Sequence, residues 1–262
     1  INMKVLIVGG VAGGMSAATR LRRLMEDAEI IVLEKGPYVS FANCGLPYFI
    51  AGEITTRDQL LLQTPESLKA RFGLDVRPNQ EVLAIHPEQK TVTIHRDSET
   101  YEESYDKLIL APGAKAIIPK IPGLDRATNC RQLRNVPDMD AILQKIDQHT
   151  RQAVVVGAGF IGLEMAESLK NRGLEVTVVE KASQVLPSMD EEMAAYVKNE
   201  LIAKGIKVIT GQSAVSFEEE GKKIRLEDDT VLDSDLTLLS IGVQPESRLA
   251  AEAGITTGIR GG

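Results

Sequence analysis

Cysteine is scarce in this chain, which has only Cys44 and Cys130 among 262 residues. Two cysteines cannot build a disulfide framework, so the sequence favours a reducing compartment such as the cytoplasm. They are also far apart along the chain, which excludes the closely spaced pair of a dithiol redox centre.

Long apolar runs and a surplus of positive charge are missing as well. No apolar run approaches about 18 residues, so no transmembrane helix is expected, and the N-terminus shows no signal-peptide pattern. The net charge of −7 argues against a nucleic-acid partner. The hydrophobic fraction of 43% and the charged fraction of 26% are typical of a globular protein with one large or two smaller domains.

A pattern of buried strand, glycine-rich turn and helix occurs twice. The first copy begins at Met3 and its next apolar run ends in Glu34, whereas the second begins at Gln152 and its next strand ends in Glu180. In each copy the acid follows the first glycine by about 20 to 25 positions, the spacing of a dinucleotide-binding βαβ unit. Continuous apolar strands predict parallel sheets. We therefore expect an α/β fold with two Rossmann-like dinucleotide-binding domains and small antiparallel β elements.

The glycine turns explain how such units bind nucleotides. Glycines let the backbone approach a pyrophosphate, and the following helix presents free N–H groups and a positive dipole end. The second turn has all three expected glycines: Gly157, Gly159 and Gly162. The first departs from the pattern, because Val11 stands at the middle position between flanking glycines. The alternative interpretation is that the glycines only permit tight packing of strand against helix.

The remaining segments predict the domain organisation. Residues 81–94 and 101–110 alternate like antiparallel strands, and residues 105–113 predict a strand that ends in a tight turn. Residues 116–122 resemble a linker with two prolines. Amphipathic helices are expected at 138–148 and 190–204, and short strands at 207–209, 214–217, 222–226 and 235–240. The first domain is expected to span residues 1–115, with 241–262 returning toward it, and the second 116–240.

Cys44 lies in the segment Ser40-Phe-Ala-Asn-Cys-Gly-Leu-Pro-Tyr48. Pro47 is expected in the first turn of a helix. A cysteine just before that turn is expected to meet the positive end of the helix dipole, which favours the reactive thiolate. A lone cysteine beside a cofactor module suggests chemistry with an external sulfur or oxygen. An inert buried cysteine is the alternative, and it is the preferred interpretation for Cys130.

Together, the two nucleotide units, the Ala111-Pro112-Gly113 turn and the Cys44 segment resemble the flavin-dependent pyridine nucleotide-disulfide oxidoreductases. The resemblance is to their single-cysteine branch, which includes coenzyme A (CoA)-disulfide reductases, CoA-persulfide reductases, NADH oxidases and NADH peroxidases. It runs from Met3 to Gly262 and implies an enzyme. It also implies that a second FAD-contacting segment and a dimerisation domain are absent, so that this chain is an N-terminal portion of a homodimeric protein.

The resemblance assigns a cofactor to each unit, and no metal. In the first unit, the residues expected to line FAD are Gly9, Gly10, Ala12, Gly13, Glu34, Lys35, Val82, Ala111, Pro112 and Gly113. In the second, the residues expected to bind the nicotinamide nucleotide are Gly157, Gly159, Phe160, Ile161, Gly162, Glu164, Glu180, Lys181 and Gly242. The carboxylate of Glu180 would bond the 2′-hydroxyl of NADH and repel the 2′-phosphate of NADPH, which favours NADH.

The resemblance makes Cys44 the catalytic residue. NADH would reduce FAD, electrons would pass to a Cys44–sulfur adduct, and a thiol would be released from a CoA-disulfide or CoA-persulfide. The residues expected to contact CoA are Ser16, Arg20, Arg23, Ser40, Asn43 and Arg71. Arg71 stands beside Phe72, which occupies the position where a basic residue is expected.

Other interpretations remain. The first is an NADH oxidase or peroxidase that cycles Cys44 through sulfenic acid. Ala12 argues against it, because those relatives carry a histidine at that position. The others are a flavin reductase that serves a protein electron acceptor and a non-enzymatic nucleotide-binding module. The arginine run of residues 20–23 could also be only a solvated helix face.

Overall fold

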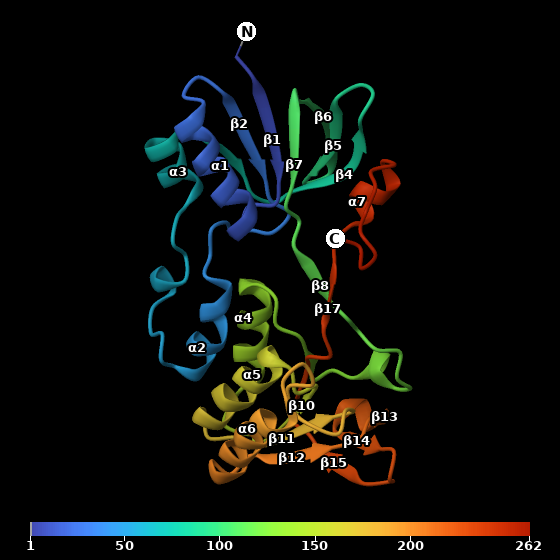
Figure 1. Cartoon of the computed structure of the whole chain (residues 1–262). Coiled ribbons are helices and arrows are strands. Elements are labelled where there is room, and N and C mark those ends of the chain that lie inside the picture. Colours follow the sequence, from blue (N-terminus) through green and yellow to red (C-terminus); the bar gives the residue numbers. More distant parts are fainter. Residues whose placement is uncertain (1) are drawn as a thin grey trace. The chain divides into compact units, whose positions relative to one another are not determined.

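The computed structural model describes residues 2–262, which form two compact units (Figure 1). The first unit contains residues 2–42, 57–115 and 244–262, and the second contains residues 43–56 and 116–243. Residues 43–56, which carry Cys44, thus belong to the second unit, although the sequence prediction placed them with the first. No helix of the described residues is long and apolar enough to cross a membrane.

The first unit is built on a four-stranded parallel sheet in the order β3-β2-β1-β7. Its strands are β1 (Lys4–Val8), β2 (Glu29–Leu33), β3 (Asp75–Arg77) and β7 (Lys107–Leu110). The helices α1 (Ala12–Leu24) and α3 (Pro65–Phe72) cover one face (Figure 1). Val5 and Ile7 of β1 pack toward these helices. Because strand side chains alternate between faces, Leu6 and Val8 pack on the other face, against β4 and β5.

The other face carries a three-stranded antiparallel sheet of β4 (Gln80–His86), β5 (Thr91–Arg96) and β6 (Glu99–Ser104). The prediction of one strand over residues 101–110 is wrong, because the chain leaves this sheet after Ser104 and joins the parallel sheet at Lys107. The strand predicted within residues 105–113 is confirmed as β7. Two hydrogen bonds between Asp106 and Lys4 hold the chain where it passes from one sheet to the other. The amide of Asp106 donates to the carbonyl of Lys4, and its carboxylate accepts from the Lys4 amide at 2.7 Å. The helix α7 (Arg248–Glu252) packs beside β4 through Leu249.

The second unit repeats this plan. Its five-stranded parallel sheet has the order β12-β11-β10-β16-β9. The strands are β9 (Cys130–Arg131), β10 (Gln152–Val156), β11 (Glu175–Glu180), β12 (Lys207–Thr210) and β16 (Leu236–Leu239). Its helices are α2 (Leu46–Ala51), α4 (Val136–Lys145), α5 (Phe160–Asn171) and α6 (Glu191–Ala203). A three-stranded antiparallel sheet contains β13 (Ala214–Glu218), β14 (Lys223–Leu226) and β15 (Val231–Asp233). Both units therefore confirm the predicted α/β class.

Short elements complete the chain. Strands β8 (Ala114–Ala116) and β17 (Val243–Pro245) pair with each other, and 3₁₀ turns occur at η1 (Asn43–Gly45), η2 (Arg57–Gln59), η3 (Leu124–Arg126) and η4 (Glu219–Gly221). Helix α4 begins two residues before its predicted start, because the Asn135 side chain accepts the Asp138 amide at 2.9 Å and caps it. The short strands β3, β8, β9, β15 and β17 were not predicted.

The glycine turns bring strand and helix into close contact in both units. A Cβ atom on Gly14 would lie 1.7 Å from the carbonyl oxygen of Gly9, and one on Gly162 would lie 2.1 Å from that of Gly157. In contrast, a Cβ on Gly159 would meet nothing within 4 Å. Thus Gly14 and Gly162 are needed for tight packing of strand against helix, while Gly159 leaves open space beside the turn.

This contrast predicts a large difference between two alanine substitutions in the same turn. We expect Gly162→Ala to destabilise the second unit by on the order of 3 kcal/mol, because a backbone carbonyl cannot move aside. Gly159→Ala should cost less than about 1 kcal/mol. Urea unfolding followed by circular dichroism measures both, and equal midpoints for the two variants would refute the steric argument.

Candidate functional site

The first glycine turn is held between the strands of the first unit. The Gly9 amide donates to the carbonyl of Leu33 at 2.8 Å, with Gly9 in the left-handed region at φ +104°. A Cβ atom on Gly10 would lie 3.0 Å from the Cβ of Glu34, so the acid packs closely against the turn. Ala12 and Gly13 are exposed at the start of α1. The exposed backbone here bears no bulky side chain and fits a pyrophosphate.

Of the other predicted FAD residues, Lys35 and residues 111–113 follow strands β2 and β7 of this sheet, and Val82 lies on β4. Lys35 is exposed and pairs with Glu81 at 2.8 Å. Ala111 follows β7, and Gly113, two residues later, has φ +72°. Val82 is 4% exposed and packs in the core, next to a register shift in the β4–β5 pairing. Its side chain is therefore inaccessible, and only its main chain can face a ligand.

The second glycine turn is bound directly by its acid. Glu180 accepts the amide of Ala158 at 2.7 Å through Oε2 and the amide of Ala182 at 2.8 Å through Oε1. Gly159 immediately precedes α5, whose first residues Phe160 and Ile161 are 64% and 42% exposed. These large exposed apolar side chains beside an open turn fit the faces of a nucleotide.

The remaining predicted residues of the second site are accessible. Glu164 lies on α5 and Lys181 directly follows β11, and both side chains are exposed. Gly242 has φ +123°, and its carbonyl accepts the Ile117 amide at 3.0 Å. The loop after β16 is thus fixed in a conformation that favours glycine.

Cys44 is exposed in the 3₁₀ turn η1, directly before α2. Pro47 lies in the first turn of α2, as the sequence predicted. Helix α2 packs against α4 and α5, and the Arg172 side chain donates to the carbonyl of Ile50. The segment that follows Cys44 is therefore anchored to the second unit, while the cysteine itself remains accessible.

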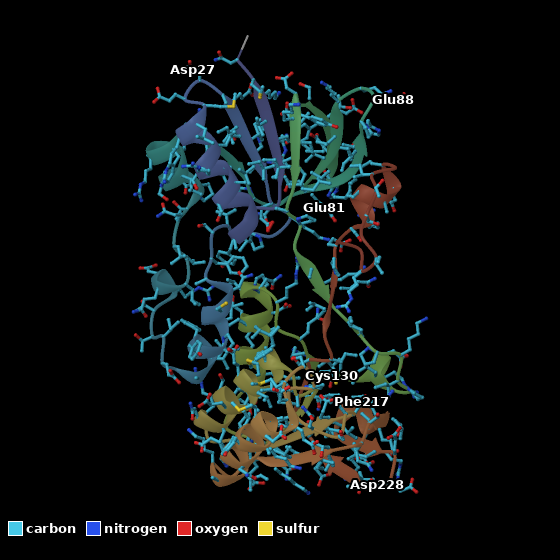
Figure 2. The ribbon with its side chains drawn as sticks, viewed as in Figure 1. Asp27, Glu81, Glu88, Cys130, Phe217 and Asp228 are labelled. Carbon is cyan, nitrogen blue, oxygen red and sulfur yellow. The ribbon has the colours of Figure 1, made fainter. Side chains whose placement is uncertain are left out.

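Cys130 has the opposite environment. It packs against the apolar cluster that contains Phe217, and both residues are marked in Figure 2. Burial raises the pKa of the Cys130 thiol to about 11, although a hydrogen bond with Thr237 and the charge of Arg131 oppose this shift. A thiol held in its protonated form is a poor nucleophile, which agrees with the packing role expected from the sequence.

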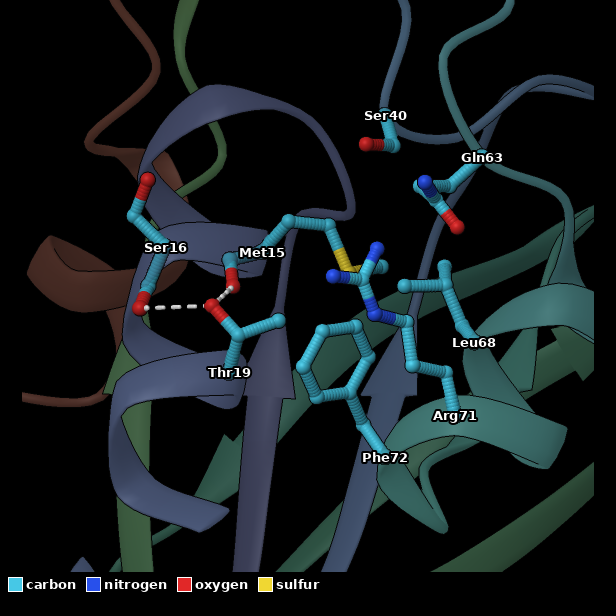
Figure 3. A pocket seen from close by; sticks show the side chains of 8 residues that line it. All are labelled: Met15, Ser16, Thr19, Ser40, Gln63, Leu68, Arg71 and Phe72. Atoms are coloured by element: carbon cyan, nitrogen blue, oxygen red, sulfur yellow. Dashed lines mark hydrogen bonds between the residues drawn. The ribbon is translucent and has the colours of Figure 1, made fainter. Parts of the chain in front are cut away.

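A pocket of about 230 Å³ opens between α1 and α3 in the first unit (Figure 3). Its lining residues are Met15, Ser16, Thr19, Ser40, Gln63, Leu68, Arg71 and Phe72. Three predicted CoA residues meet here, namely Ser16, Ser40 and Arg71. The guanidinium of Arg71 lies 5.1 Å from the centre of the Phe72 ring and supplies a positive charge at the pocket.

The other three predicted CoA residues lie elsewhere. Arg20 and Arg23 are exposed on α1 and do not line the pocket, and Asn43 belongs to the second unit. Sequence reasoning missed Met15, Thr19, Gln63 and Leu68. The spacing of Ser16 and Thr19, three residues apart on one helix face, was the available signal.

Arg22 was also missed, and it organises the pocket wall. Its guanidinium donates to the carbonyls of Phe72 and Gly73 at the end of α3, at 2.8 and 3.2 Å. It also donates to the carbonyls of Met25, Glu26 and Ala28 beyond the end of α1. Because one side chain joins the ends of both helices, it fixes α3, and hence Arg71, against α1.

The fold and its turns define a protein with two dinucleotide-binding units. Residues 3–262 match the family model described as pyridine nucleotide-disulphide oxidoreductase. The chain belongs to this family.

Several known proteins are similar. Coenzyme A disulfide reductase of Staphylococcus haemolyticus is 38% identical over 261 residues, which cover 98% of this chain and 58% of that protein. NADH oxidase of Methanocaldococcus jannaschii is 35% identical with the same coverage. The crystal structure of reduced Bacillus anthracis CoADR-RHD matches with a TM-score of 0.97 and 51% identity, covering 100% of this chain and 47% of that one. The chain thus spans about half the length of these relatives.

The two cysteines should differ sharply in reactivity. We expect iodoacetamide at near-neutral pH to alkylate Cys44 first, because its side chain is exposed. Cys130 should gain reactivity only as the pH rises toward about 11, where its thiol ionises. Peptide mass spectrometry over time measures both rates, and labelling of Cys130 as fast as Cys44 would contradict this assignment.

Proposed function

We propose that this chain is the nucleotide-binding and thiol-bearing part of a flavoenzyme that uses NADH to reduce CoA-disulfide or CoA-persulfide substrates. The observation that carries the proposal is a single exposed cysteine, Cys44, in a chain with two dinucleotide-binding units. The name of the Staphylococcus haemolyticus relative, coenzyme A disulfide reductase, supports the same substrate class. The intact protein is proposed to be a homodimer.

The first unit would hold FAD, and the second NADH. The exposed backbone of Ala12 and Gly13 supports a pyrophosphate site at α1, and the open space at Gly159 supports another at α5. Glu34 and Glu180 would accept hydrogen bonds from the riboses. FAD, when bound, supplies the two-electron relay between the nicotinamide and a disulfide.

Cys44 would carry the thiol chemistry. Its thiolate attacks one sulfur of the CoA-disulfide, a Cys44–CoA mixed disulfide forms, and one CoA leaves as the thiolate. Reduction of that mixed disulfide by two electrons and protonation release the second CoA thiol and restore Cys44. An exposed cysteine without a second cysteine nearby suits this cycle, because no internal disulfide competes.

The pocket of the first unit would bind part of the CoA moiety. Arg71 offers a charge for a phosphate, while Ser16, Thr19 and Gln63 offer polar groups. Ser40 lines this pocket, and only three residues separate it from Cys44 in the sequence. Arg20, Arg23 and Asn43 remain candidates for the more exposed parts of the substrate.

An NADH oxidase is the second candidate, favoured by the name of the Methanocaldococcus jannaschii relative. In that cycle, an oxidant would convert Cys44 to sulfenic acid. Ala12, at the start of α1, provides no proton-transferring side chain where oxidase and peroxidase members of the branch carry histidine. The CoA reductase is therefore preferred.

Replacement of Cys44 tests whether a thiol enzyme, rather than a flavin reductase or a non-enzymatic nucleotide-binding module, is the correct interpretation. In the purified protein, Cys44→Ser should lower CoA-disulfide reduction by at least about a thousandfold, because the attacking thiolate is lost. NADH-dependent reduction of a dye should persist, since it needs only the nucleotide sites. Cys130→Ser is the matched control and should retain CoA-disulfide reduction. If Cys44→Ser reduced CoA-disulfide as fast as the parent protein, the proposed mechanism would be excluded.

Glu180 should make the protein prefer NADH. We expect kcat/KM for NADH to exceed that for NADPH by at least about tenfold, because the carboxylate repels the 2′-phosphate. Glu180→Gln should lower the ratio of kcat/KM for NADH to kcat/KM for NADPH. Glu175→Gln, which removes the same charge at the opposite end of β11, should leave the ratio as it was. Steady-state dye reduction measures all three, and equal efficiency with both nucleotides in the parent protein would refute the prediction.

A further inference from the structure

Two residues adopt the left-handed backbone conformation in unusual places. Ser40 has φ +47° and Leu186 has φ +45°. The other described non-glycine residues with positive φ all lie in turns between successive strands, where this conformation is ordinary: Asn79, Lys90, Asp97, Glu219, Glu220 and Asp229. The conformation is unfavourable for serine and leucine, so the surrounding structure must impose it.

The two residues make the same hydrogen bond in the two units. The Ser40 amide donates to the carbonyl of Gly10, and the Leu186 amide donates to the carbonyl of Ala158, both at 2.8 Å. Gly10 and Ala158 are the second residues of their glycine turns. Ser40 and Leu186 each stand six positions after the acid that ends the second strand of the unit. Because a serine and a leucine make the same bond, the bond depends on the backbone amide and not on the side chain.

This bond fixes the orientation of one peptide group in each turn. Gly9 and Gly157 already donate to the second strand at 2.8 Å, so each turn is held at two consecutive residues. In a trans peptide the C=O and the following N–H point in opposite directions. When the carbonyl of Gly10 or Ala158 is held by the loop after the acid, the next amide is directed away from that loop. These amides belong to Val11 and Gly159, which precede α1 and α5.

We propose that Ser40 and Leu186 are positioning residues. Each holds the loop that follows the acid, Glu34 or Glu180, against the glycine turn through its amide, and this hydrogen bond, here called the latch, sets the nucleotide affinity of its own unit. The latch directs the amide of Val11 or Gly159 toward the pyrophosphate before the nucleotide arrives. This inference rests on the proposed assignment of FAD to the first unit and NADH to the second.

The first latch has a second role. The Ser40 side chain lines the pocket between α1 and α3, as Figure 3 shows. Its amide thus holds the flavin turn while its hydroxyl faces the proposed CoA pocket. The two roles can be separated, because a side chain can be changed without loss of the amide.

The test compares substitutions that differ in their tolerance of positive φ. Ser40→Thr keeps the hydroxyl but is β-branched, whereas Ser40→Gly loses the hydroxyl but favours the left-handed region. We expect Ser40→Thr to weaken FAD binding about tenfold, which corresponds to about 1.4 kcal/mol. Ser40→Gly should bind FAD at least as tightly as the parent protein. Flavin fluorescence titration measures both.

The second latch has its own matched pair. Leu186→Ile changes only the branching of a side chain that is 5% exposed, whereas Leu186→Met keeps an unbranched Cβ. We expect Leu186→Ile to bind NADH about tenfold more weakly than Leu186→Met, again equivalent to about 1.4 kcal/mol. A substitution at Ser40 should weaken FAD binding more than NADH binding, and a substitution at Leu186 should do the reverse. General destabilisation of the protein would weaken the binding of both nucleotides.

The outcomes separate the latch from the proposed function. Equal FAD affinity of the Thr and Gly variants at position 40, or equal NADH affinity of the Ile and Met variants at position 186, would overturn the latch. If the parent protein bound neither nucleotide, the proposed function would fail instead. Amide hydrogen exchange would then decide: protection of the Ser40 and Leu186 amides supports the latch, and rapid exchange refutes it. If Ser40→Thr fails to fold, Ser40→Ala against Ser40→Gly makes the same comparison.

Discussion

The structure depends on the contact between the first residue of each glycine turn and the third residue of the helix that follows. The carbonyl of Gly9 lies where a side chain on Gly14 would be, and the carbonyl of Gly157 lies where one on Gly162 would be. This contact brings the helix start onto the end of the parallel sheet. The acid at the end of the second strand can then reach the turn, as the bond from Glu180 to the Ala158 amide shows.

Both units use one plan, and their differences are local. In the first, Gly10 is closely packed, because a Cβ atom at that position would lie 3.0 Å from the Cβ of Glu34 and 3.1 Å from a methyl carbon of Val39. In the second, Ala158 occupies the same place with its side chain fully buried. The common arrangement is therefore set by main-chain contacts, and the side chains around each turn differ between the two units.

The sequence was sufficient for features that repeat with a period or a fixed spacing. The apolar strands, the two glycine turns and the acids Glu34 and Glu180 have such patterns, and so the fold class followed from them. The pairing of residues 101–110 with two different sheets did not, because the partners β5 and β1 cannot be identified from the pattern of this segment alone. The attachment of residues 43–56 to the second unit was also hidden, since packing of α2 on α4 and α5 has no local signature.

Arg22 illustrates a wider consequence of this architecture. At the ends of α1 and α3, each acceptor of its guanidinium is a backbone carbonyl. Its partners can therefore change their side chains freely without weakening the interaction. Pairs of residues that vary together across relatives would not reveal it, although it joins the ends of two helices. The contact therefore depends on the side chain of Arg22 and on no particular side chain of its partners.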